Sequence, residues 1–160
     1  MKGNLAITDV KQRKLELNED GKKGVRTQFG ALCWRRHEGE IQVLLITSRR
    51  TRRWIIPKGW PQHQTTPVKA AAAEAWEEAG VEGRAKATCL GIYSYNKDLD
   101  EGDQMPCVVA LFPVKVKKLR RKYPEMAERR RKWFSLKKAA KRVAEPELAA
   151  LILGFDPKGL

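Results

Sequence analysis

Three carboxylates with the spacing of metal ligands lie near the middle of the chain: Glu74, Glu77 and Glu78. In a helix, positions i, i+3 and i+4 share one face, with about 5–6 Å between neighbouring Cβ atoms. Like charges this close repel each other unless a divalent cation lies between them, and hard oxygen ligands suit Mg²⁺ or Mn²⁺. We therefore expect the three glutamates to hold such a metal in a catalytic site. An exposed acidic helix face is the alternative interpretation.

The residues that precede the glutamates carry groups that bind phosphate. Five cations and no acid lie between positions 49 and 58, namely Arg49, Arg50, Arg52, Arg53 and Lys58. A short apolar run, residues 54–56, then leads into a loop at Pro57, Lys58 and Gly59. Cations of this density attract polyanions. A cationic loop beside an acidic helix face is the arrangement that metal-assisted phosphoryl chemistry needs.

The rest of the pattern predicts the elements that position these groups. Pro67 suits a first helical turn, four consecutive alanines favour a helix, and Gly80 suits its end, so a helix over 67–79 is expected. Further helices are expected over 137–143 and 147–153, and strands over 25–36, 40–48, 54–56, 85–94, 105–116 and 130–136. Strands on both sides of one central helix predict the α+β class with a mixed sheet.

Length and composition bound the possible classes of protein. The chain has 160 residues with a formal net charge of +14, and 42% of its residues are hydrophobic. This length favours one domain, residues 25–160, after a polar arm over 1–24. No apolar run approaches the roughly 18 residues of a membrane span, so we expect no membrane partner and a cytoplasmic location. Cys33, Cys89 and Cys107 are interpreted as small buried residues in a reducing compartment.

Most of the charge excess lies in one run, residues 115–142. It holds fourteen basic and two acidic residues, a net charge of +12. The two acids are Glu125 and Glu128. The run is interpreted either as a surface that attracts a polyanion or as a solvated face that keeps the protein soluble. Glu125 and Glu101 remain open as a further metal ligand or as the general base.

The stretch from Gly59 to Val81 resembles the Nudix box, whose pattern is G-x5-E-x7-R-E-U-x-E-E-x-G-U with U apolar. Seven of the nine specified positions match in register, namely Gly59, Glu74, Ala75, Glu77, Glu78, Gly80 and Val81. Two positions depart from the pattern. Thr65 stands where the family has its first glutamate, and Ala73 stands where the family has an arginine that orients a neighbouring glutamate.

The flanking segments extend this resemblance. Residues 46–59 are similar to the Nudix subgroup that cleaves diphosphoinositol polyphosphates and dinucleoside polyphosphates, and residues 130–134 resemble its last core strand. The resemblance implies an αβα sandwich and Mg²⁺ (or Mn²⁺) as cofactor. It also implies catalytic and metal-binding roles for Glu74, Glu77 and Glu78, and substrate-binding roles for Arg26, Arg49, Arg53, Lys58 and Gly59.

These expectations lead to one function and two alternatives. The leading interpretation is a metal-dependent pyrophosphohydrolase of polyphosphorylated small molecules, either diphosphoinositol polyphosphates or dinucleoside polyphosphates. Because a basic surface also follows a nucleic-acid backbone, removal of pyrophosphate from RNA 5′ ends is an alternative. Thr65 and Ala73 motivate the other alternative, a catalytically weak module that binds phosphate ligands. The sequence predicts no oligomeric state.

Overall fold

Strand β1 (Thr27–His37) lies in the middle of an eight-stranded mixed sheet. The computed structural model describes residues 26–99 and 102–160, so the expected arm over 1–24 and Glu101 lie outside the described residues. The other strands are β2 (Glu40–Thr47), β3 (Trp54–Ile55), β4 (Lys58–Gly59), β5 (Val81–Ala85), β6 (Gly91–Asp98), β7 (Gln104–Leu119) and β8 (Arg131–Ser135).

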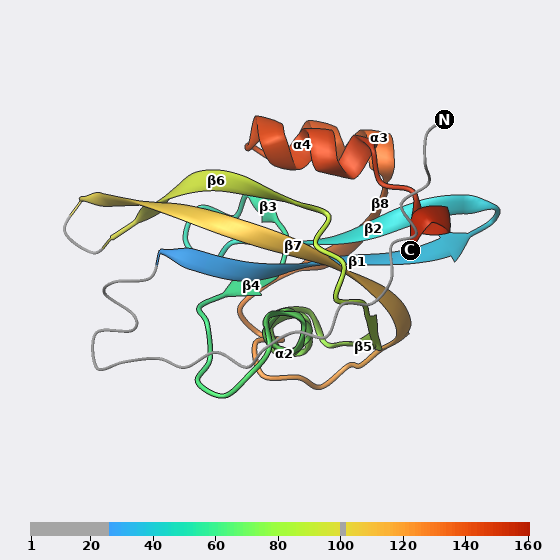
Figure 1. Ribbon diagram of the computed structural model, residues 1–160, viewed down its shortest axis with the longest axis horizontal. Helices are drawn as coiled ribbons and strands as arrows, with labels where there is room; N and C mark the ends of the chain where they lie inside the picture. Colours follow the sequence, from blue (N-terminus) through green and yellow to red (C-terminus); the bar gives the residue numbers. More distant parts are fainter. Residues whose placement is uncertain (1–25, 100–101) are drawn as a thin grey trace.

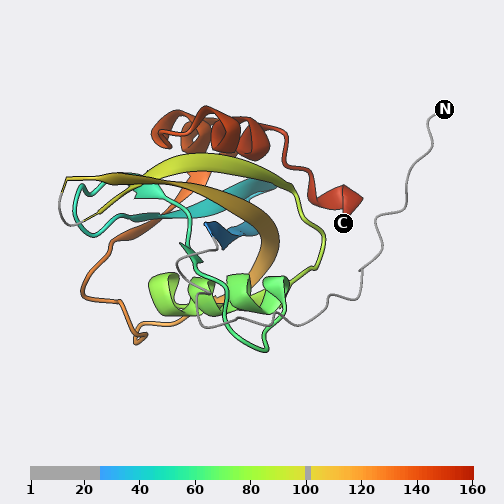
Figure 2. The same cartoon turned by 60° about the vertical axis from the view of Figure 1, so that its left-hand side comes forward.

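Helices cover both faces of this sheet. Figure 1 shows α2 (Pro67–Ala79) below the sheet, with α3 (Leu136–Arg142) and α4 (Pro146–Leu153) above it. The turned view in Figure 2 shows the same three layers. A mixed sheet between helices confirms the α+β class and the αβα sandwich that the resemblance implied. Among the described residues, no helix is long and apolar enough to cross a membrane.

Strand β1 is buried on both faces because its alternating side chains enter two different cores. Leu32 and Trp34 pack into the core under α3 and α4, whereas Phe29, Ala31 and Cys33 pack into the core over α2. The strand is parallel to β7 and antiparallel to β2 and β4. A strand with neighbours along both edges and cores on both faces forms a rigid base for the segments attached to it.

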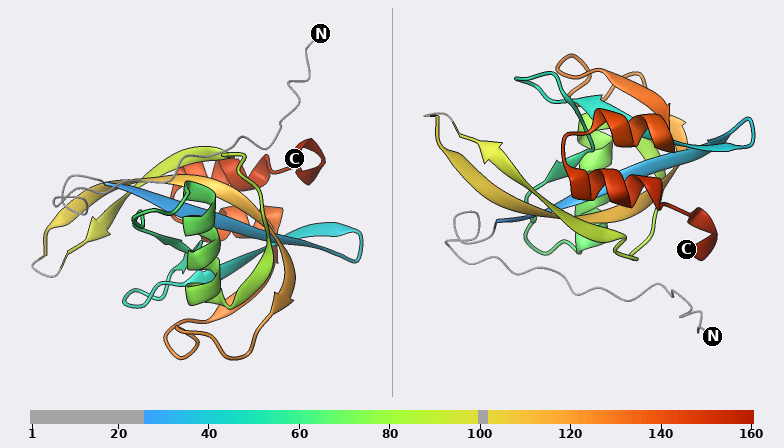
Figure 3. Two further views of the ribbon diagram at one scale, coloured as in Figure 1. Left: turned by 60° about the horizontal axis from the view of Figure 1, so that its bottom comes forward. Right: turned by 90° about the horizontal axis from the view of Figure 1, so that it is seen from above.

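Helix α2 has the bounds that the sequence predicts. The Thr66 hydroxyl accepts a hydrogen bond from the Lys69 backbone N–H, Pro67 begins the helix, and Gly80 ends it with φ of 66°. A positive φ is favourable for glycine, which explains the stop. The inward face of α2 is mostly alanine: Ala70, Ala71, Ala75 and Ala79 are buried. Small side chains let the helix lie close to the sheet, and the left view of Figure 3 shows α2 lying across the strands.

The pairing of β4 with β1 was not predicted from the sequence, because the pattern placed Lys58 and Gly59 in a loop. The structure pairs Gly59 with Phe29 and Lys58 with Gly30 in an antiparallel bridge. The Ala31 backbone N–H also donates to the Pro57 carbonyl at 2.9 Å. These contacts are long-range in sequence, so local propensity does not reveal them. They fix the segment that precedes α2 against the central strand.

A second correction concerns the predicted strand over 85–94. The structure divides it into the end of β5 and the start of β6, both of which pair with β7. The intervening residues 86–90 lie opposite Pro113, which has no N–H to donate to a neighbouring strand. The prediction that all three cysteines are buried is wrong for Cys89, which is exposed. Cys33 and Cys107 are buried as expected.

Candidate active site

Two carboxylates of α2 are buried against the sheet. Glu74 and Glu78 lie one helical turn apart, with only 9% and 7% of their surface exposed. Glu77 lies between them in sequence and is partly exposed. The structure therefore rejects a simple solvated acidic face for α2, because two of its three predicted ligands face the interior.

The Glu74 carboxylate fills the space that Gly59 leaves open. A Cβ atom built on Gly59 would overlap with all three atoms of that carboxylate group, so a larger residue here would displace the carboxylate from its place. Glu74 Oε2 is buried and has no hydrogen-bond partner among the described residues. Burial, followed by repulsion from Glu77 and Glu125, raises the pKa of Glu74 to about 7.

The Glu78 carboxylate is held from two sides. The Lys58 backbone N–H donates to Glu78 Oε1 at 3.4 Å, and Arg129 Nη2 forms an ion pair with the same oxygen at 3.8 Å. Burial raises the pKa of Glu78 to about 7, with Arg129 opposing the shift and Glu74 adding to it. Burial therefore disfavours the charged form of both carboxylates near neutral pH, although Arg129 and Lys58 oppose the rise in their pKa.

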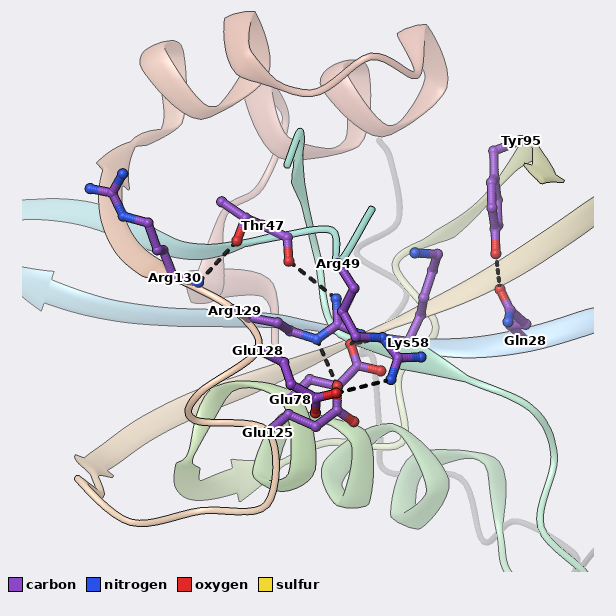
Figure 4. A network of polar contacts seen from close by, with 10 residues as sticks. All are labelled: Gln28, Thr47, Arg49, Lys58, Glu78, Tyr95, Glu125, Glu128, Arg129 and Arg130. Carbon is purple, nitrogen blue, oxygen red and sulfur yellow. Dashed lines mark hydrogen bonds and ion pairs between the residues drawn. The ribbon is translucent and has the colours of Figure 1, made fainter. Parts of the chain in front are cut away.

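Arg129 is the central cation of the site, although the sequence did not identify it. Its side chain is 7% exposed and its Nε donates to Glu125 Oε1 at 2.8 Å. Its Nη1 donates to the Thr47 carbonyl at 3.1 Å, which ties it to the end of β2. Figure 4 shows the Arg129 side chain directed toward Glu125 and Glu78. No spacing rule selects it from the consecutive basic residues 129–132.

The loop between β7 and β8 is attached to the C-terminal end of α2. The Glu125 backbone N–H donates to the Glu77 carbonyl at 3.0 Å, and Arg120 donates in the same way to Gly80 at 2.9 Å. Arg131 Nη1 donates to the Ala79 carbonyl at 2.7 Å, where a helix end carries partial negative charge. These three contacts bring Glu125 beside the α2 carboxylates.

The residues present fit a divalent cation. Buried carboxylate oxygens without partners are costly unless a cation or donor satisfies them, and Glu74 Oε2 is such an oxygen. The donor set of Glu74, Glu78 and nearby Glu125 is the hard oxygen type that Mg²⁺ or Mn²⁺ takes. Within residues 26–99 and 102–160, no three His, Cys, Asp or Glu side chains already converge as a complete metal site.

A cationic cleft of about 300 Å³ adjoins these carboxylates, between the β2–β3 turn and β6. Six cations line this cationic cleft, and the one acid among its described lining residues is Asp98. The six are Arg49, Arg50, Arg53, Lys58, Lys97 and Arg129. Three of the predicted substrate-binding residues, Arg49, Arg53 and Lys58, thus lie in one cleft, and Lys97 joins them from a segment that the sequence did not connect with the site.

Lys58 links the cleft to the α2 carboxylates. Its ammonium lies 4.9 Å from the centre of the Tyr95 ring, while its backbone N–H contacts Glu78. Burial lowers the pKa of Lys58 to about 8, although Glu78 opposes this shift. Tyr95 in turn donates from its hydroxyl to Gln28 on β1 (Figure 4). The position of the Lys58 side chain is therefore set by β1, β4 and β6 together.

The arginines of the cleft are not equivalent. Arg53 Nη1 forms an ion pair with Glu145 Oε2 at 2.8 Å, and only 10% of the Glu145 side chain is exposed. Arg49 forms a looser ion pair with Glu128 at 3.5 Å, where both side chains are about half exposed. Arg53 thus also anchors the segment that begins α4, whereas Arg49 is free to turn toward a ligand.

Two predicted residues lie away from the cleft wall. Gly59 is buried under Glu74, so its place is structural support for that carboxylate rather than the wall of the cationic cleft. Arg26 is exposed just before β1 and is not among the residues that line the cleft. Its substrate-binding role stays a prediction, and so does the metal-binding role of Glu77.

Comparisons with known proteins agree with this fold. A model of the NUDIX domain matches residues 25–153, which is most of the chain. The crystal structure of the Caenorhabditis elegans Ap4A hydrolase covers 81% of this chain and 94% of its own, with a TM-score of 0.57 and 21% sequence identity. The chain therefore belongs to the NUDIX domain family.

Two curated relatives give the similarity in sequence. Mouse diphosphoinositol polyphosphate phosphohydrolase 3-alpha is 32% identical over 122 residues, which cover 74% of this chain and 70% of the relative. Nudix hydrolase 13, mitochondrial, of Arabidopsis thaliana is 31% identical over 107 residues, which cover 64% of this chain. The chain spans 53% of the length of this plant relative. Because its name places it in mitochondria, the cytoplasmic location of our chain stays a prediction.

Proposed function

We propose that this protein is a metal-dependent pyrophosphohydrolase of small molecules that carry many phosphates, such as diphosphoinositol polyphosphates or dinucleoside polyphosphates. The observation that carries the proposal is the cationic cleft, since two of its six cationic residues, Lys58 and Arg129, contact the buried Glu78 carboxylate of α2. Similarity to the mouse diphosphoinositol polyphosphate phosphohydrolase and the fold of the nematode Ap4A hydrolase support it.

In this proposal the cleft binds the phosphates that are not cleaved. Arg49, Lys58 and Lys97 come from three different segments, so they surround an anion rather than contact one side of it. Contacts between cations and phosphate oxygens are charge-assisted, and arginine adds two-pronged geometry. A substrate with several phosphates satisfies more of these cations than a sugar diphosphate does. The charge of the cleft therefore selects for highly phosphorylated substrates.

The carboxylates of α2 would hold the metal. Glu74 and Glu78 are the proposed direct ligands, with Glu77 or Glu125 adding to them. When bound, Mg²⁺ or Mn²⁺ neutralises charge on the scissile pyrophosphate and makes nearby water more acidic. Arg129 keeps Glu125 and Glu78 in place, and Gly59 leaves the space that the Glu74 carboxylate needs.

The direct test is hydrolysis of a substrate panel with Mg²⁺ and with Mn²⁺. The panel holds dinucleoside polyphosphates, diphosphoinositol polyphosphates, nucleoside diphosphate sugars and triphosphorylated RNA. We expect kcat/KM to be highest for one of the first two classes. Preference for the sugar diphosphates contradicts the proposal, and preference for the RNA favours the alternative in which the basic surface follows a nucleic-acid backbone.

A variant pair connects activity to α2. Glu78→Gln removes a ligand charge and keeps the side-chain shape, so kcat should fall at least about 10²-fold with the fold intact. Glu82→Gln, the same change at an exposed residue of β5, should leave kcat unchanged. If wild-type protein binds these substrates but hydrolyses none of them, the module that only binds phosphate ligands becomes the better description.

A further inference from the structure

A second hollow with strong positive charge lies on the sheet where β1, β5 and β7 run side by side. Its volume is about 260 Å³. The cations that line it are Arg36, Arg84, Lys86 and Lys115, and no aspartate or glutamate is among its described lining residues. We refer to these four cations and the hollow between them as the second cationic pocket.

The second cationic pocket is separate from the cationic cleft. The two share no lining residue. Strand β4 pairs with β1 at Phe29 and Gly30, whereas the pocket uses Trp34 and Arg36 farther along the same strand. At about 3.3 Å per residue, Arg36 lies about 20 Å from Gly30 along β1. Figure 1 shows β5 and the β1–β2 hairpin at the opposite end of the sheet from the β6–β7 hairpin.

The strands hold the four cations close together. Lys115 of β7 lies directly opposite Arg84 of β5 on one side and Trp34 of β1 on the other. Lys115 Nζ lies 5.4 Å and Arg36 Cζ 6.0 Å from the centre of the Trp34 ring, so one aromatic ring orients both cations. Because strand pairing fixes these positions, the four cations lie close together even without a ligand.

This arrangement is unfavourable without an anion. Like charges directly opposite each other on neighbouring strands destabilise a sheet. Within residues 26–99 and 102–160, none of the four cations forms an ion pair with an aspartate or glutamate. The nearby acid of β5, Glu82, pairs with Arg120 instead, at 2.8 Å. The charge of the pocket is therefore left for a ligand to neutralise.

We propose that the second cationic pocket is a binding site for a small oligophosphate anion, distinct from the site of hydrolysis. A chain of linked phosphates presents several oxygens at once, and the cations of three strands can each donate to a different one. No aspartate or glutamate is among the described residues that line the pocket, so no acidic side chain there would hold a metal, and the anion is bound there and not cleaved. This site goes beyond the proposed function and does not depend on it.

The test is calorimetric titration with inorganic tripolyphosphate in the absence of divalent metal. Wild type should bind two tripolyphosphate ions, one in the cationic cleft and one in the second cationic pocket. The Arg84→Gln, Lys115→Gln double variant should bind one ion fewer than wild type, whether or not the cationic cleft binds its own. The matched control, Lys137→Gln with Lys141→Gln, changes the net charge equally on exposed residues of α3 outside both sites and should still bind two.

Two results would overturn the proposal. One is an unchanged isotherm for the double variant, and the other is an equal loss in the control, which would assign binding to net charge. If the double variant does not fold, the single variants Arg36→Gln and Lys86→Gln replace it, with at least tenfold weaker binding at one site expected in each. Hydrolysis by the double variant should stay at the wild-type rate, so failure here leaves the proposed function untouched.

Discussion

The two basic stretches of the sequence, residues 49–58 and 115–142, differ in where the structure places their cations. The shorter one forms a turn and two short strands, and four of its five cations line a single cleft. The longer one passes through β7, a loop, β8 and α3, so its cations spread over several surfaces. Arg129 enters the site, Lys115 enters the second cationic pocket, and Arg131 contacts the end of α2. A run of basic residues in the sequence therefore need not form one basic patch on the surface of the folded protein.

The largest effect should come from Arg129, the cation of the longer stretch that contacts the buried carboxylates. Arg129→Ala leaves the buried Glu78 and the partly buried Glu125 without this cation, so the free energy of unfolding should fall by about 3–5 kcal/mol. In the same variant kcat should fall about 10²-fold. Arg129→Lys keeps the charge but loses the fork of donors, so it should restore only part of either quantity.

Arg130 offers the matched control for this comparison. It is the next residue, its side chain is exposed, and Figure 4 shows it pointing away from the carboxylates. Chemical denaturation and steady-state kinetics of Arg130→Ala should give wild-type values. Equal losses in both alanine variants would mean that the loop, and not the Arg129 guanidinium, supports the site.

The second prediction concerns the buried carboxylates that both stretches face. The pKa values of Glu74 and Glu78 are raised to about 7 in the folded protein, from an ordinary value of 4.5. Between pH 4.5 and 7 the unfolded chain binds fewer protons, so stability without metal should fall as the pH rises through this range. The loss should be on the order of 3 kcal/mol for each of the two carboxyl groups.

Thermal unfolding of metal-free protein between pH 4 and pH 8 measures this effect. Glu78→Gln removes one of the two titrating groups, so its unfolding temperature should depend less on pH than that of wild type. Mg²⁺ should stabilise wild type more at pH 8 than at pH 5, because protons no longer compete for the carboxylates. If the unfolding temperature depends on pH in the same way in wild type and Glu78→Gln, these carboxyl groups do not cause the pH dependence.

The third prediction concerns the shorter stretch. Lys58→Met should raise KM about ten- to a hundredfold for a substrate with many phosphates, since a charge-assisted contact is worth about 1.5–3 kcal/mol. The rise should be smaller for a nucleoside diphosphate sugar, which leaves other cleft cations unused. Arg49→Ala should follow the same order. Equal changes for both substrates would show that Lys58 holds the loop rather than the phosphates.

Arg53 is a poorer test of substrate binding than Lys58. Its ion pair with the buried Glu145 means that Arg53→Ala also leaves that carboxylate without its partner. Combining Arg53→Ala with Glu145→Gln separates the two roles. The free energy of unfolding should return toward the wild-type value in the double variant, whereas KM should stay raised.

The smallest effect should come from the solvated part of the longer stretch. Lys137→Glu with Lys141→Glu reverses two charges on exposed positions of α3. Because exposed charges are screened over about 8–10 Å, KM should change less than about twofold at physiological salt. A larger change for these variants than for Lys58→Met would reverse the comparison between the two stretches.

The sequence alone determined the parts of this protein that depend on local pattern. The helix over 67–79 follows from Pro67, the alanines and Gly80, because capping and propensity act within a few residues. The spacing of Glu74 and Glu78 on one face follows from helical geometry, and the box pattern led to the family that the comparisons confirm. The cations before α2 were also recognised, since they are consecutive with it.

Only the tertiary structure decided which distant residues complete the site. Arg129 and Lys97 reach it through strand pairing, and the burial that raises the pKa values of Glu74 and Glu78 arises when β4 joins β1. The four cations of the second cationic pocket likewise meet only through the β1–β7–β5 register. Long-range pairing depends on the complementarity of whole faces of the sheet, so no local spacing encodes it.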